Sequence, residues 1–350
     1  EICFPMRILF SRAGGTEDSI LLLLSKEYHM TFLKANSFYQ ICITIWTEGG
    51  ICVKLIIKIL MHWDFAQSLH GAHSRITNAY YIRTPDKEES DMPANYALYR
   101  FGRDVLKRLP ELAFLHSGHC RQAFLTGLHG PDLLFFHNPL KRDAICRLGY
   151  AMHRQPARAF FERGVQYVQK TADPLALAYL LGFVCHFTLD SACHGYIGKY
   201  EAQKGVSHAR IEAELDRFYM LRYGENPARC NSAAHILPSR TLAKAIAPLF
   251  KIPAEDALLS MRSIRFYSGL LTARNPAKRA LLCTVMSIPT LKHYVGDMVI
   301  ASEPDPHCKE AVEWLTAQTA ASVETACRLI GAFMQSVRTG APLPSAFGRS

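Results

Sequence analysis

The side chains best suited to chemistry lie in two short segments of the chain. The first carries His186, Asp190 and His194 at intervals of four residues, and the second carries His208 and Glu212 at the same interval. On an α-helix such positions share one face, because the helix turns once every 3.6 residues. Imidazole and carboxylate groups are ligands that zinc accepts, so two such faces turned inward would form a polynuclear metal site.

Each of these groups also has an ordinary explanation when it is taken alone. A histidine on an apolar face is usually a core residue with a hydrogen-bond partner, and a His–Glu pair is usually a solvated contact on a helix surface. Asp190 favours the metal, because its helix is the most apolar in the chain and no lysine or arginine occurs between Lys170 and Lys199. Burial of an isolated carboxylate is costly unless a cation pairs with it. We therefore expect a metal held jointly by His186, Asp190 and His194.

Helices must position these residues, and the sequence from Met92 onward has a helical pattern. Asp173 followed by Pro174 predicts a helix start, and the apolar run behind them predicts a central, buried helix. The predicted helices cover residues 96–108, 157–170, 175–200, 207–221, 241–250, 254–271, 278–300 and 309–337. No run with strand period is evident, so the predicted fold class is all-α. One domain would extend from Met92 to about Gly340, followed by a short tail over residues 341–350.

Residues 1–91 have a different character. Their hydrophobic clusters keep no sustained period of 2 or 3.6. Lys87, Glu88 and Glu89 can be encoded by a purine-rich run of the kind that binds bacterial ribosomes shortly before a start codon. Two interpretations are open: translated upstream DNA before a true start at Met92, which we favour, or a poorly structured native extension. Since no secretory signal is evident, we expect a cytoplasmic protein.

The composition is that of a globular protein, with 49% hydrophobic and 20% charged residues. Residues 1–91 hold 9 basic and 10 acidic side chains, so the formal charge of +10 comes from the remainder. A basic surface attracts anionic partners such as phospholipid headgroups or nucleic acid, although a soluble protein can also simply be basic. The most apolar early stretch, residues 51–63, is too short to span a membrane.

Cysteine usage argues against two further classes of protein. The 11 cysteines are odd in number and include no Cys-x-x-Cys pair, which excludes a disulfide framework and a cysteine zinc ribbon. Cys185 or Cys193 could serve as a lone nucleophile, but buried structural cysteines are commoner.

The order of the chemical residues resembles the zinc-dependent phospholipase C family, whose bacterial members share an all-helical trinuclear zinc fold with the S1/P1 nucleases. The family's Gly-x-x-Gly-Pro-Asp-like segment is matched up to Asp132, and a histidine on its following helix is matched by His153. The segment from Met92 to Gly102 also resembles the start of cytoplasmic members. The resemblance spans about residues 92–221 and implies seven metal ligands, namely Asp132, His153, His186, Asp190, His194, His208 and Glu212.

The resemblance implies a buried site with two or three zinc ions. The first four of these residues would hold one ion and the last three a second. The family's third ion uses the mature N-terminal residue, an early histidine and the equivalent of Asp190. Here the early histidine falls near Leu98, which cannot bind metal. The third ion would then be absent, or it would borrow His116, His119 or His129.

The implied activity is hydrolysis of phosphate esters, with Asp132 binding metal and also orienting or deprotonating the attacking water. We expect a phospholipase C-like phosphodiesterase. The alternatives are a nuclease or nucleotidase on the same scaffold, a metal-binding protein whose catalysis is weak or lost because of Leu98, and a helical interaction module without metal. His137 could touch the substrate, although we favour an ordinary surface or core histidine. Residues 133–136 could form a lipid-facing lip, although we favour ordinary core packing.

Overall fold

The computed structural model divides the chain into two compact units, residues 1–87 and 88–350, which are described separately. The structure describes residues 9–11, 19–25, 28–35, 38–46, 52–59, 94–116, 118–139, 143–272, 275, 278, 282, 297 and 299–348.

The first unit contains a five-stranded antiparallel sheet in which each strand pairs with the next along the chain. Its strands are β1 (Leu9–Ser11), β2 (Ser19–Ser25), β3 (Tyr28–Ala35), β4 (Phe38–Trp46) and β5 (Cys52–Ile59). The register places Ile43 of β4 opposite Met30 on one side and Leu55 on the other. The five strands lie in a segment where the sequence shows no sustained period. Continuous apolar runs such as residues 20–24 form strands without the alternation that periodicity detects. The start at Met92 stays a prediction, and residues 60–93 lie outside the described residues.

The second unit is all-α, as predicted, with no strand among its described residues. The elements are α2 (Asn95–Arg108), η2 (Ala113–Leu115), α3 (Gly118–Gly127), η3 (Gly130–Phe136), α4 (Ala144–His153), α5 (Arg158–Thr171), α6 (Pro174–Lys204), α7 (His208–Arg222), α8 (Arg240–Phe250), α9 (Ala254–Leu271), η5 (Pro306–Cys308), α12 (Lys309–Thr339) and η6 (Ser345–Gly348). The helix predicted over residues 278–300 falls mostly outside the described residues.

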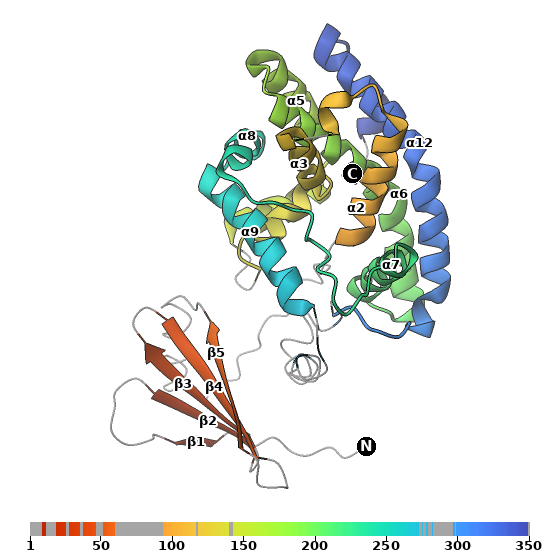
Figure 1. Cartoon of the computed structure of the whole chain (residues 1–350). Helices are drawn as coiled ribbons and strands as arrows, with labels where there is room; N and C mark the ends of the chain where they lie inside the picture. The colour runs from red at the N-terminus through yellow and green to blue at the C-terminus, as the bar shows by residue number, and fades with distance from the viewer. Residues whose placement is uncertain are drawn as a thin grey trace, which may run out of the picture. The chain divides into compact units, whose positions relative to one another are not determined.

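Helix α6 is the central helix of this unit, and α12 packs along it and along α2 (Figure 1). Its start is the predicted one: the Asp173 carboxylate accepts hydrogen bonds from the Leu175 and Ala176 amides at 2.8 and 3.3 Å, and Pro174 takes the first helical position. By length and composition alone α6 could cross a membrane, but 72% of its apolar window is buried inside the unit. Such burial is typical of a core helix in a bundle.

Helices α3 and α6 cross with their backbones in contact. A Cβ atom on Gly127 would collide with the Tyr179 carbonyl oxygen, and one on Gly182 with the Phe124 carbonyl oxygen. Only glycine permits this approach. Because η3 follows α3 after a short turn, the crossing places η3 beside the middle of α6.

Leu343 and Phe347 pack into the core, although they lie in the tail that the sequence predicts over residues 341–350. Phe347 is fully buried, and its ring centroid lies 4.9 Å from that of Phe161 and 5.7 Å from that of Phe187. The Arg158 guanidinium donates hydrogen bonds to the carbonyls of Leu343 and Pro344. Phe347 is the only large buried residue in this short helical turn, so hydrophobic periodicity in the sequence could not predict its burial.

Replacement of Phe347 by alanine should therefore destabilise the helical unit. We expect a loss of about 3–5 kcal/mol in the free energy of unfolding, as for other buried phenylalanines. Urea denaturation of the full chain, followed by circular dichroism, measures this loss. The matched control is Phe266→Ala, because Phe266 is 63% exposed. Equal losses in the two variants would contradict a packed C-terminus.

Helix α2 is capped by a residue from another helix. Its own N-cap residue, Ala94, offers no side-chain hydrogen bond. Instead, Oδ1 of Asp216 on α7 accepts a hydrogen bond from the Ala97 amide at 2.8 Å. Burial of Asp216 raises the pKa of its carboxyl to about 8, although hydrogen bonds from the amides of Ala97 and Tyr96 act in the opposite direction.

This raised pKa makes a pH-dependent contribution to stability. Between the unfolded value near 4 and the folded value of about 8, the folded protein retains a proton on Asp216 that the unfolded chain has released. Stability from this group is therefore full below about pH 4 and falls as pH rises to about 8. Asp216→Asn keeps an acceptor for the Ala97 amide but cannot ionise.

We expect the free energy of unfolding of Asp216→Asn to decline less between pH 5 and pH 8 than that of the wild type. Urea titrations at both pH values, with chelator present throughout, measure the difference. Parallel pH profiles for the two proteins would show that the Asp216 carboxyl titrates normally.

Candidate metal site

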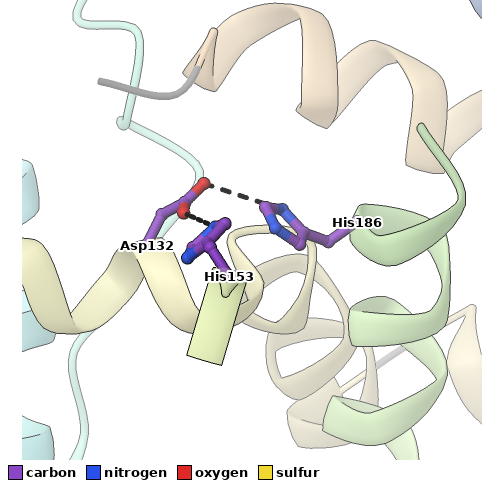
Figure 2. Close-up of side chains that lie close together, drawn as sticks. All are labelled: Asp132, His153 and His186. Carbon is purple, nitrogen blue, oxygen red and sulfur yellow. Dashed lines mark ion pairs between the residues drawn. The ribbon is translucent and has the colours of Figure 1, made fainter. Parts of the chain in front are cut away.

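Three elements bring Asp132, His153 and His186 together (Figure 2). Asp132 lies in the first turn of η3, His153 ends α4, and His186 lies in the middle of α6. Nε2 of His153 is 2.8 Å from Oδ1 of Asp132, and Nδ1 of His186 is 3.7 Å from Oδ2. One ligand atom from each residue lies within 4.8 Å of the other two, and among the described residues no other such group of three was found.

The orientation of His153 is set by its own helix. Its Nδ1 donates a hydrogen bond to the Gly149 carbonyl at 3.0 Å, one turn earlier in α4. The opposite nitrogen, Nε2, therefore faces Asp132. A backbone carbonyl that fixes the ring in this way is the usual support of a metal-binding histidine.

His186 is held against the turn that precedes Asp132. Gly130 has a φ of +47°, and a Cβ atom there would collide with the His186 ring. The Tyr179 hydroxyl donates a hydrogen bond to the Gly130 carbonyl at 3.1 Å, which fixes the turn. Both ring nitrogens of His186 are buried without a hydrogen-bond partner. Buried polar atoms normally have one, so a cation between His186 and Asp132 would satisfy an otherwise costly arrangement.

The charges in this cluster balance one another. Burial alone would raise the pKa of the Asp132 carboxyl, but His186 and His153 beside it hold that pKa below its usual value. Burial opposes protonation of His153, yet the Asp132 carboxylate raises the pKa of this imidazole to about 10. The cluster is thus built around an ionised carboxylate that requires positive charge beside it. Two imidazoles and one carboxylate are a donor set that suits Zn²⁺.

A second group lies where α6 meets α7. The rings of His194 and His208 have centroids 5.4 Å apart, and Nε2 of His208 is 3.3 Å from Oε1 of Glu212. Ser207 caps α7 as predicted, because its hydroxyl oxygen accepts the Arg210 amide at 3.2 Å. The structure therefore brings together the three residues that the resemblance assigns to one ion.

Asp190 lies on α6 between the two groups, but the expectation that it is buried is wrong. Its side chain is 34% exposed and lies 3.8 Å from Nδ1 of His194. Its charge also helps to raise the pKa of His153, so it acts on the first group as well. The cause is the course of α6, which reaches the surface here and leaves Gly195 exposed. Its carboxylate is thus only partly desolvated, and the desolvation argument for a metal applies more strongly to Asp132.

The early histidine of the family has no counterpart on α2, where Leu98 is buried in the core. Of the three histidines that could replace it, His119 is exposed, and His116 bonds the Leu109 carbonyl near the far end of α2. His129 is fully buried, and the charges of Asp132 and His186 both affect its pKa.

His129 forms a pair that the sequence analysis missed. Its Nε2 lies 2.8 Å from Nε2 of His235, whose ring stacks on Tyr99 with centroids 4.6 Å apart. Burial lowers the pKa of His235 to about 3 and that of His129 well below its usual value. Both rings are therefore neutral, and one donates its N–H to the other. Their separation of 106 residues left no local pattern to detect.

The residues that follow Asp132 build the scaffold. Residues 133–136 are buried in the core, not in a lipid-facing lip. His137 lies between two carboxylates, with Nδ1 2.7 Å from Asp143 and Nε2 3.2 Å from Asp256, and so joins η3 to α4 and α9. Cys185 and Cys193 are also buried, and burial raises the pKa of Cys193 to about 12, which disfavours a thiolate nucleophile.

Fold and site together define an all-helical metal-binding domain with nitrogen and oxygen donors. The model of the zinc-dependent phospholipase C family matches residues 99–256, a range that includes all seven predicted ligands. This region of the chain is therefore a domain of the zinc-dependent phospholipase C family. Comparisons with curated proteins and with solved structures found no match.

The contact between Gly130 and His186 yields a prediction about metal binding. Gly130→Ala should displace the His186 ring and lower the zinc content of the purified protein at limiting zinc. Gly118→Ala is the matched control, because Gly118 also has positive φ, at +62°, but has no atom within 4 Å of an added Cβ. Equilibrium dialysis against zinc measures both variants. If both lose zinc equally, backbone strain and not the collision with His186 is responsible.

Proposed function

We propose that the helical unit is a zinc-dependent phosphodiesterase of the phospholipase C type. The observation that carries this proposal is the buried cluster of Asp132, His153 and His186 inside the region that matches the family. The net positive charge of the chain, +10, suits an anionic phosphate ester as substrate.

The residues present fit zinc, because they offer imidazole nitrogens and carboxylate oxygens around an ionised carboxylate. Bound zinc would supply charge to neutralise a phosphodiester and would lower the pKa of a water molecule. His153 and His186 would hold one ion together with Asp132. We assign Asp190 to the same ion and His194, His208 and Glu212 to a second, since these side chains lie in the adjacent group.

Asp132 has two compatible roles in this proposal. Its lowered pKa keeps the carboxylate ionised, so it can bind a cation and can also accept a hydrogen bond from a water molecule. The two oxygens face different histidines, Oδ1 toward His153 and Oδ2 toward His186. Asp132 would thus orient the attacking water from a fixed position, while Gly149 holds His153 in place.

Elemental analysis of the purified full chain tests the metal site. We expect two or three zinc ions per chain, with one fewer in His186→Ala and one fewer in Glu212→Ala, because each variant removes a donor from a different group. His307→Ala is the control, since His307 is exposed and is not among the candidate ligands. A folded wild-type protein without zinc would overturn the proposal.

Activity assays of the zinc-loaded protein then separate the remaining functions. Hydrolysis of phosphoethanolamine or phosphocholine diesters supports the phospholipase C type, whereas cleavage of single-stranded DNA alone would indicate a nuclease. Bound zinc with no hydrolysis of any phosphodiester would identify a metal-binding protein in which Leu98 has replaced an essential ligand.

A further inference from the structure

A pocket outside the cluster of Asp132, His153 and His186 has Glu212 in its lining. It lies between the start of α2, the face of α7 and the end of α9, and residues 227–232 complete it. Its polar lining consists of Asn95, Glu212, Asp216, Ser232, Ser268 and Thr272. Glu212 is therefore shared between this pocket and the candidate metal site.

Asn95 is the deepest polar group in this lining. It is only 3% exposed, and its Nδ2 donates long hydrogen bonds to the hydroxyls of Ser232 and Ser268, at 3.4 and 3.5 Å. Its carbonyl oxygen, Oδ1, is buried and has no hydrogen-bond partner. A buried acceptor without a partner is costly, so the site is suited to a ligand that brings an N–H or O–H donor.

The remaining lining has the same preference for donors. The Thr272 hydroxyl already donates to the Ser268 carbonyl at 2.8 Å, so its lone pairs are left to accept. Glu212 adds carboxyl oxygens, whereas Oδ1 of Asp216 already accepts the Ala97 amide. The described lining residues include no lysine, arginine or histidine that would bind a phosphate, and no aromatic ring that would hold a trimethylammonium group.

We propose that this pocket binds the alcohol headgroup of the phosphodiester, and that it selects headgroups carrying N–H or O–H donors over trimethylammonium headgroups. The inference rests on the proposed function, because the phosphate would lie at the metal residues and the headgroup would reach past Glu212 to Asn95. Ethanolamine and glycerol headgroups share the required donors, whereas choline lacks them.

Calorimetric titration of the zinc-loaded full chain tests the pocket without turnover. The probes are phosphoethanolamine, glycerol phosphate, phosphocholine and inorganic phosphate. We expect phosphoethanolamine to bind about tenfold more tightly than phosphocholine, as one or two additional hydrogen bonds would provide. If glycerol phosphate binds more weakly than phosphoethanolamine but more tightly than phosphocholine, the ammonium charge also contributes to affinity. If glycerol phosphate and phosphoethanolamine bind equally, the hydrogen-bond donors alone determine the preference.

Two variants locate the preference. Asn95→Leu removes the acceptor at similar volume, and Ser268→Ala removes a hydroxyl that positions Asn95. Both should reduce the preference for phosphoethanolamine while the affinity for inorganic phosphate stays the same. Ser336→Ala is the control, because this buried serine bonds the Ala332 carbonyl within α12 and lies outside the pocket lining. Melting temperatures of all variants report folding, and Ser268→Ala carries the test if Asn95→Leu does not fold.

The outcomes distinguish this inference from the proposed function. If inorganic phosphate binds but phosphocholine binds as tightly as phosphoethanolamine or more tightly, the headgroup pocket is overturned and the phosphodiesterase proposal stands. An unchanged preference in folded Asn95→Leu and Ser268→Ala also overturns it. No binding of any phosphate compound to a zinc-loaded protein overturns both.

Discussion

The ionised carboxylate of Asp132 inside the helical core is the constraint on which the rest of the site depends. A buried negative charge is stable only where positive charge or hydrogen-bond donors surround it. Two histidines from different helices, His153 and His186, lie beside Asp132 and can meet this requirement. Because η3, α4 and α6 must all meet at one point, the crossing of α3 over α6 and the tight turn at Gly130 follow from the same constraint.

In the second group, the regular spacing of residues along a helix determines which side chains share a face. His194 lies on the same face of α6 as His186 because it is eight residues further along the helix. Glu212 lies on the same face of α7 as His208 because it is four residues further along. Both helix starts have side-chain caps, Asp173 for α6 and Ser207 for α7, which set the register of these intervals. Local sequence thus determines which side chains share a face, whereas packing determines which faces meet.

This difference explains how far the sequence could predict the structure. Helix bounds and the residues of α6 and α7 follow from caps and spacing, and Asp132 and His153 came from a resemblance to a family. The pair of His129 and His235 and the cap that Asp216 provides for α2 link residues 106 and 119 positions apart, which no local pattern encodes. The strands within residues 9–59 lacked alternation, and Asp190 was expected to be buried because the composition of α6 does not reveal where the helix reaches the surface.

The predicted ligands differ in exposure, and the two most exposed of them, Asp190 and His194, lie on α6 where it reaches the surface. Side-chain exposure is 4% for His186 and 7% for Asp132, and it is also low in the second group for His208 and Glu212, at 5% and 15%. Only Asp190 and His194 are more exposed, at 34% and 40%. A phosphate ester would therefore meet the side of His194 first, with Asp132 behind it. From that depth Asp132 can organise the centre and orient a water molecule, whereas groups that contact the rest of the substrate must lie on the open side. The polar pocket shares Glu212 with the second group, so a substrate held at these residues would have the proposed headgroup pocket beside it.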